Sequence, residues 1–300
     1  MRIAYVCTDY NWKSFSVIRS IYETLVAFGY EVEKFSNMDN IQADNFDQVW
    51  VASSIIRLER VDVFTIVFGF SDPNFYSETR MMFSDFYCTN SLDIAREKSA
   101  YYFPPFGNSQ YFISQETDRE IDCVFLGLAK HRYIPQRVEM VDRLRAEGIT
   151  VVTYGSDWKS VADHPDNRAF VEGEDLIRIL NSAKLCLDLT TEKTSLSSRI
   201  FQASMCSTPV LTWNREDVRL LLEPNEEILL YSSMDEFVEV TKKCLQIPER
   251  LRKIGENARK RCLQEHDVTV RITNLIDYLK VNYPPKPLRS GLEWACKSPG

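Results

Sequence analysis

Short apolar runs recur along this chain, and a segment with helical spacing follows most of them. One set falls at residues 3–7, 30–35, 46–52 and 61–68, and a second set at 121–126, 150–154, 185–189, 209–213 and 228–231. Strands that are apolar throughout, rather than alternating, are typical of a parallel sheet covered by helices on both faces. The pattern therefore predicts an α/β protein with two Rossmann-like, doubly wound domains in series.

The alternation stops in a polar stretch at residues 109–120 and then restarts. We expect the first domain to cover residues 1–110 and the second to cover residues 120–282. The tail, residues 283–300, begins with prolines and contains Trp294, and we expect it to cross back to the first domain. Two facing domains of this kind form a cleft at the carboxyl ends of their strands, where ligands of open α/β sheets bind.

Charge and cysteine usage narrow the classes of function. The net charge of −7 argues against broad adhesion to nucleic acid or to anionic membranes. The eight cysteines are scattered and form no C-x-x-C pair, so we expect reduced, mostly buried thiols and a cytoplasmic protein. No apolar run approaches the length of a transmembrane helix.

One stretch of the second domain has the features of an anion site. Residues 185–189 form an expected strand, a hydroxyl-rich loop follows, and Ser197, Ser198 and Arg199 open a helix. Free backbone N–H groups and the helix dipole favour a phosphate at such a helix start. Arg199 adds a forked cation that suits a diphosphate. The alternative is a serine-capped core helix with a surface arginine.

Six motifs carry a resemblance to a known family. They are FGFSDP (68–73), YFPP (102–105), VFLG (124–127), VTYGSDW (152–158), SRIFQA (198–203) and HDVTVR (266–271). In this order they resemble the spore-maturation-type (CgeB-like) branch of the group 1 glycosyltransferases, over most of the chain. The resemblance implies a GT-B fold, in which two Rossmann-like domains face each other across a cleft. It also implies a nucleotide-diphosphate-sugar donor in the second domain, hexosyl or pentosyl transfer with retention, and no required metal. The absence of any Asp-x-Asp pair fits that last expectation.

The resemblance assigns roles to individual residues. Arg199 would neutralise the diphosphate of the leaving nucleotide. Asp72, which follows an apolar strand, would orient or deprotonate the acceptor hydroxyl, unless it is only a turn residue before proline. The expected nucleotide-binding residues are Gly127, Lys130, Arg132, Gly155, Trp158, Ser197, Ser198, Arg199 and Gln202. For Trp158 the alternative to stacking on a base is packing in the core, and for Lys130 and Arg132 it is a solvated loop.

The sequence departs from the family at Gln202, where a glutamate commonly binds the ribose hydroxyls. Its usual partner glutamate would fall at Thr194. The acceptor stays open among a small molecule, a glycan, a protein and modified DNA, and Thr8, Asp9 and Tyr10 are further candidates to line its site. Two other functions therefore stand beside the transferase: a DNA-modifying glycosyltransferase that acts on a hydroxylated base, and a catalytically weak sugar-nucleotide-binding protein.

Overall fold

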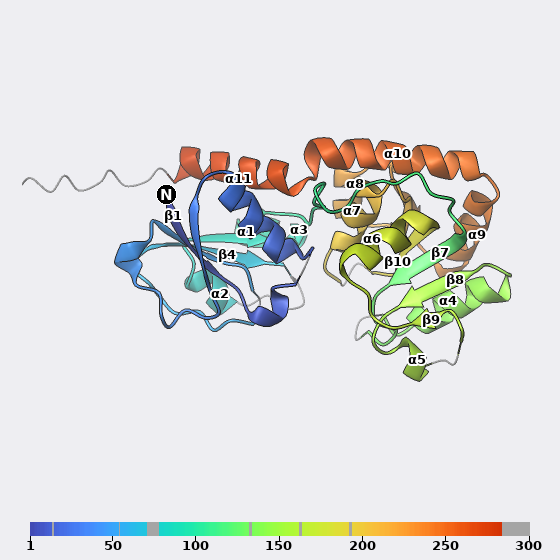
Figure 1. Ribbon diagram of the computed structural model, residues 1–300, viewed down its shortest axis with the longest axis horizontal. Helices are drawn as coiled ribbons and strands as arrows, with labels where there is room; N and C mark the ends of the chain where they lie inside the picture. The colour runs from blue at the N-terminus through green and yellow to red at the C-terminus, as the bar shows by residue number, and fades with distance from the viewer. Residues whose placement is uncertain are drawn as a thin grey trace, which may run out of the picture.

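The computed structural model describes residues 1–13, 15–53, 55–70, 78–131, 134–161, 164–191 and 194–283. In this part of the chain two α/β domains lie side by side (Figure 1). Two long C-terminal helices run along one side of the molecule, one over each domain (Figure 1).

The first domain is built on a six-stranded parallel sheet with strand order β2-β1-β3-β4-β5-β6. Its strands are β1 (Arg2–Val6), β2 (Glu31–Phe35), β3 (Gln48–Val51), β4 (Phe64–Gly69), β5 (Phe86–Thr89) and β6 (Tyr101–Tyr102). Ile3, Trp50 and Phe68 in the central strands are fully buried. This burial on both faces explains why those strands are apolar throughout.

The helices of the first domain follow its strands. They are η1 (Asp9–Asn11), α1 (Val17–Ala27), η2 (Ala43–Asn45), α2 (Glu78–Met82) and α3 (Leu92–Lys98). Helix α1 begins at Ser16, whose side chain caps the backbone N–H of Arg19. It ends before Gly29, which adopts the left-handed conformation that glycine tolerates (φ 84°).

The second domain contains another six-stranded parallel sheet, with strand order β12-β11-β10-β7-β8-β9. Its strands are β7 (Ile121–Leu126), β8 (Val151–Tyr154), β9 (Asn167–Arg168), β10 (Ala183–Asp188), β11 (Val210–Trp213) and β12 (Leu229–Tyr231). Its helices are α4 (Arg137–Ala146), α5 (Trp158–Val161), α6 (Gly173–Ser182), α7 (Ser198–Met205), α8 (Glu216–Leu221), α9 (Met234–Leu245) and α10 (Pro248–Glu265). The two doubly wound sheets confirm the predicted fold class.

The last helix, α11 (Val268–Asn282), lies on the first domain rather than on the second. Val268, Ile272 and Leu275 belong to the same buried cluster as Ile3 and Ile21 of the first domain. The expected boundary of the second domain at residue 282 is therefore wrong, because the chain crosses back before α11. The tail from residue 284, with Trp294, lies outside the described residues.

The two crossings between the domains are hydrogen-bonded to each other. The N–H of Gly107 donates to the carbonyl of His266 (3.1 Å), and the N–H of Val268 donates to the carbonyl of Gly107 (2.9 Å). A Cβ atom on Gly107 would lie 2.8 Å from Cγ of Met205, so this crossing has little room for a side chain. The hinge between the domains is thus a pair of backbone segments packed against α7.

The loops that follow the strands of the two sheets contact each other. Lys13, after β1, lies 3.9 Å from the Glu172 carboxylate, which precedes α6. Arg96 in α3 makes a bidentate ion pair with Glu216 at the start of α8, at 2.7 and 3.0 Å. The carboxyl ends of the two sheets therefore face one another, as the two-domain prediction requires.

All cysteines in the described part of the chain are buried free thiols: Cys7, Cys88, Cys123, Cys186, Cys206, Cys244 and Cys262. This confirms the expectation of buried, unpaired thiols for those residues. Across the same described ranges, no helix has both the length and the apolar character needed to cross a bilayer.

Candidate functional site

The second sheet has a topological switch point between β7 and β10. From β7 the chain steps outward to β8 and β9, and it then returns to the other side of β7 with β10. Connections diverge at such a point, and the crevice outside the carboxyl ends of the two strands is where open α/β sheets bind ligands. The loops that follow β7 and β10 therefore frame the candidate site.

Two glycines close the β7 side of this site. The N–H of Gly127 donates to the carbonyl of Tyr154 at 2.9 Å. A Cβ atom on Gly155 would lie 2.3 Å from the carbonyl oxygen of Gly127, so no other residue fits there without a shift of the backbone. The two glycines let the ends of β7 and β8 approach each other at the edge where we predicted a nucleotide.

Trp158 packs in the core beside these glycines. Its side chain is fully buried, its ring meets Phe125 edge-on with centroids 5.8 Å apart, and its Nε1–H donates to the Gly127 carbonyl at 2.8 Å. The indole has no exposed face on which a base could stack. Of the two roles considered for Trp158, packing is the correct one, and the residue supports the Gly127 turn from behind.

The loop after β7 is held by a carboxylate that sequence reasoning missed. Asp157 accepts hydrogen bonds from the backbone N–H groups of Ala129 and Lys130, both at 2.8 Å. Lys130 itself is exposed on this loop, whereas Arg132 lies outside the described residues. The aspartate directly after the Gly155 turn was the available signal, because aspartate often bonds nearby backbone N–H groups.

Arg137 joins the two loops across the switch point. This buried side chain donates from Nε to the carbonyl of Leu189 and from Nη1 to the carbonyl of Leu128, each at 3.0 Å. Burial lowers the pKa of Arg137, although the Asp188 carboxylate opposes that shift. Sequence reasoning did not single out this arginine, since nothing in its helical position indicates that it faces inward.

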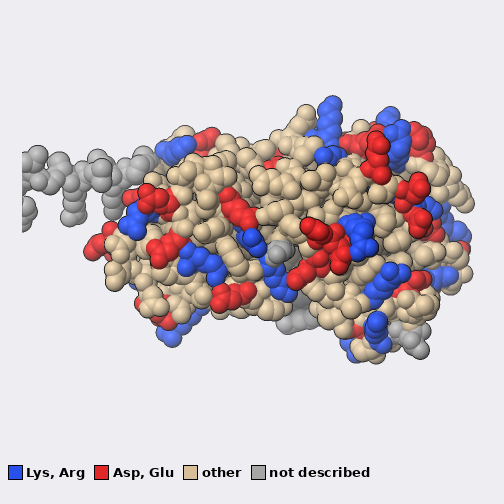
Figure 2. All heavy atoms as spheres, viewed as in Figure 1, with Lys and Arg blue, Asp and Glu red and all other residues tan. Residues whose placement is uncertain are grey.

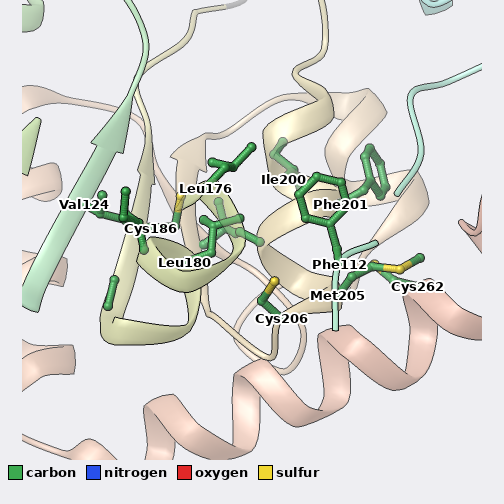
Figure 3. Packing of buried hydrophobic residues seen from close by; sticks show 14 of the residues in the cluster. Phe112, Val124, Leu176, Leu180, Cys186, Ile200, Phe201, Met205, Cys206 and Cys262 are labelled. Atoms are coloured by element: carbon green, nitrogen blue, oxygen red, sulfur yellow. The ribbon is translucent and has the colours of Figure 1, made fainter. Parts of the chain in front are cut away.

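Helix α7 points its amino end at the switch point. The side chain of Ser197 caps the helix by accepting from the N–H of Arg199 at 3.1 Å. Further along α7, Ile200, Phe201 and Met205 pack in the core between the sheet and α10 (Figure 3). Ser197 and Ser198 remain half-buried beside the loop. The helix start therefore offers N–H groups and hydroxyls in one place.

Arg199 is a cation without an ion pair in the described part of the chain. Its Nη1 donates to Oε1 of Gln202 at 2.7 Å, while its Nε is buried and has no hydrogen-bond partner. The nearby Asp188 carboxylate accepts instead from the hydroxyls of Thr190 (3.0 Å) and Thr212 (2.7 Å). Burial lowers the pKa of the Arg199 guanidinium. An orphaned donor of this kind calls for an acceptor that the described residues do not provide.

The loop after β10 is fixed by a second arginine that the sequence did not reveal. Arg215 makes a bidentate ion pair with Asp217 at 2.7 and 2.5 Å. Its Nη1 also donates to the carbonyls of Thr191 (3.2 Å) and Thr194 (2.8 Å). Thr194 is buried and uses its hydroxyl on the Thr191 carbonyl, so neither position of the expected glutamate pair carries a carboxylate.

Asp72, the predicted proton acceptor, lies outside the described residues. His164 accepts from the backbone N–H of Asp166 at 3.2 Å, as in a local turn. Within the ranges that the structure describes, no three His, Cys, Asp or Glu side chains come together as a metal site would require.

Comparison with known proteins gives a partial family match. Residues 136–277, which include α7 and Arg199, match the family described as "Glycosyl transferase-like". No curated protein matches the sequence significantly.

Solved structures with similar folds span nearly the whole chain. Sucrose-phosphate synthase from Thermosynechococcus elongatus has a TM-score of 0.69 at 13% identity, with 93% of this chain and 99% of that chain covered. The chain has the GT-B fold. Anabaena HepE, solved with UDP and glucose, has a TM-score of 0.65 at 13% identity, with 94% and 100% covered.

A third GT-B structure is an α-glucosyltransferase with UDP and a DNA 13-mer, at TM-score 0.63 and 13% identity, with 93% and 100% covered. These likenesses confirm the GT-B architecture expected from the sequence motifs. The narrower expectation, the spore-maturation-type branch, stays a prediction.

Proposed function

We propose that this chain is a glycosyltransferase of the GT-B type that takes a sugar from a nucleotide diphosphate donor. The observation that carries the proposal is the unpartnered Nε of Arg199 beside the amino end of α7, at the switch point of the second sheet. A diphosphate would supply the missing acceptor oxygens and would lie against the helix dipole. Ser197 and Ser198 would donate to the same oxygens.

The proposed reaction exchanges one C–O bond for another. The bond between the anomeric carbon and the β-phosphate oxygen breaks, and the nucleotide diphosphate leaves with the electron pair. A bond from the anomeric carbon to the acceptor oxygen forms, and the acceptor hydroxyl loses its proton. Arg199 would stabilise the charge that develops on the leaving phosphate. Asp72 remains our predicted proton acceptor, and retention and metal independence remain predictions of the family resemblance.

The ligands of the similar structures favour uridine as the donor base. HepE was solved with UDP and glucose, and with UDP-glucose, and the α-glucosyltransferase was solved with UDP. We therefore propose a UDP-sugar, with UDP-glucose as the first donor to test. The bordering elements would be the turns at Gly127 and Gly155 and the loop with Lys130.

The proposal is tested by replacing Arg199. We expect Arg199→Ala to weaken UDP binding at least tenfold in calorimetric titrations and to reduce UDP release from UDP-glucose, because a charge-assisted contact is lost. Arg250→Ala, on the exposed surface of α10, is the matched control and should leave both unchanged. If wild-type protein binds no nucleotide diphosphate, or if Arg199→Ala binds UDP normally with an unchanged melting temperature, the proposal is wrong.

A catalytically weak binding protein is the second candidate, favoured by the neutral side chains at Thr194 and Gln202. It predicts tight UDP-glucose binding without release of UDP in a single-turnover measurement.

DNA modification is a third candidate, and it needs a basic face. In the view of Figure 2, lysine and arginine are interspersed with aspartate and glutamate over both domains, and the net charge is −7. These charges favour the other two candidates over a DNA-modifying enzyme.

A further inference from the structure

Asp188 ends strand β10 at the switch point of the second sheet and is 5% exposed. It lies two residues beyond Cys186, and alternate side chains of a strand share one face. Cys186 packs with Ile200 and Phe201 of α7 in one buried cluster. Asp188 is therefore on the face of the sheet that α7 covers, at the carboxyl end of the strand, where that helix begins.

The hydrogen bonds of Asp188 do not require its charge. Its Oδ2 accepts from the hydroxyls of Thr190 at 3.0 Å and of Thr212, its neighbour in β11, at 2.7 Å. The amide oxygen of an asparagine would accept from the same hydroxyls. A carboxylate is more costly to bury than an amide, and no cation in the described ranges forms an ion pair with it. The charge of Asp188 therefore serves something other than these two hydrogen bonds.

Two buried arginines feel this charge. Arg137 reaches the end of β10 from α4, where its Nε donates to the carbonyl of Leu189 at 3.0 Å, and Arg199 reaches it from α7. Asp188 favours the charged form of both and so opposes the decrease that burial causes in the pKa of each. In the free protein the carboxylate thus partly compensates two guanidiniums. A diphosphate at Arg199 would compensate the same cations and would be repelled by Asp188.

We propose that Asp188 sets the balance between donor and product binding, because its charge repels the departing nucleotide diphosphate more than the intact nucleotide sugar. At neutral pH UDP carries about three negative charges and UDP-glucose about two, since the terminal phosphate of UDP ionises a second time at a pH of about 6. A fixed negative charge near the phosphates weakens the binding of UDP more than that of UDP-glucose. This role rests on the proposed donor site at Arg199, and it makes Asp188 a residue that promotes product release by charge rather than by contact.

Calorimetric titration of the full chain with UDP and with UDP-glucose tests this role. Asp188→Asn removes the charge and keeps an acceptor for both threonine hydroxyls. We expect it to bind UDP about thirtyfold and UDP-glucose about tenfold more tightly than wild type, so that the ratio of the two dissociation constants changes about threefold. Asp188→Thr is a second neutral variant and should change the ratio in the same direction. Asp277→Asn, at an exposed position of α11, is the matched control and should leave both dissociation constants unchanged.

A structural role alone predicts a different result. If Asp188 only held its loop, the neutral variants would melt at a lower temperature and bind both nucleotides more weakly, with the ratio unchanged. That result, or wild-type UDP affinity in the folded neutral variants, overturns the role of Asp188 and leaves the donor site at Arg199 standing. Loss of folded protein in both neutral variants overturns it too, because the charge would then be needed for the fold. If wild-type protein binds neither nucleotide, the donor site is wrong and the role of Asp188 is wrong with it.

Discussion

The Nη1 of Arg199 donates to Oε1 of Gln202 at 2.7 Å, one turn further along α7. The amide orients the guanidinium without neutralising it, because glutamine carries no charge. A glutamate at this position, which the family resemblance led us to expect, would form an ion pair with Arg199. Gln202 is thus a positioning residue for the cation that we assign to the donor diphosphate.

Replacing Gln202 by leucine should release Arg199 from this orientation. We expect Gln202→Leu to lower UDP affinity about tenfold, which equals ~1.4 kcal/mol, since a hydrogen bond to a charged group is lost. Calorimetric titration with UDP measures this change. Gln264→Leu, at an exposed position of α10, controls for the substitution itself. Unchanged UDP affinity in Gln202→Leu would show that Arg199 needs no such support.

The buried ion pair of Arg215 with Asp217 predicts a marked cost when only one partner is removed. Their side chains are 11% and 5% exposed. Arg215→Met leaves Asp217 buried and uncompensated, so we expect a loss of about 3 kcal/mol in the free energy of unfolding, measured by urea titration. The double variant Arg215→Met/Asp217→Asn should lose less. Equal losses in the single and double variants would contradict a strong coupling between the two.

Periodic apolar patterns were enough to predict the sheets and the long helices. Helices α9 (Met234–Leu245) and α10 (Pro248–Glu265) have the bounds that their apolar spacing and Pro248 predict. The side of the molecule on which α11 packs could not be predicted, because its pattern shows that it has an apolar face and not which sheet covers that face. Short helices such as α8 (Glu216–Leu221) carry too few turns to reveal a period.

The relative placement of candidate side chains could be predicted where they are close in sequence, and it could not be predicted where they are far apart. Ser197 and Arg199 could be placed together because a helix start brings neighbours into one geometry. Arg137 and Arg215 act on carbonyls from distant loops, and no local pattern marks them. Trp158 was open between stacking and packing because an aromatic side chain suits both, and only its burial decides.

The contact between Gly155 and Gly127 predicts a steric effect. In Gly155→Ala the new Cβ would lie 2.3 Å from the Gly127 carbonyl oxygen, so the β7 turn must move. We expect a loss of about 1–3 kcal/mol in the free energy of unfolding, measured by urea titration, as for other overpacked sites. Gly148→Asn is the control, because nothing lies within 4 Å of a Cβ there and asparagine tolerates its positive φ. A Gly155→Ala variant as stable as wild type would refute the close contact.

His266 at the hinge predicts acid sensitivity. Its Nδ1 accepts from Nη2 of Arg271 (2.6 Å), so the proton of the neutral ring is on Nε2, which donates to the carbonyl of Leu221 (2.7 Å). Burial, with the Arg271 charge beside it, lowers the pKa of His266 from 6.5 to about 4. Between these values the unfolded chain binds more protons than the folded one, so the stability of the fold decreases as the pH falls through 6.5 toward 4.

At pH 5 this histidine should reduce the free energy of unfolding by about 2 kcal/mol relative to neutral pH. We expect His266→Gln to lose that part of the pH dependence, because glutamine does not titrate, while its amide can still donate and accept at the hinge. Urea unfolding at pH 5 and pH 7 measures the difference for each variant. His164→Gln, in a loop far along the chain from the hinge, should keep the wild-type dependence. If His266→Gln keeps the wild-type pH dependence of unfolding, the acid sensitivity comes from other groups and not from His266.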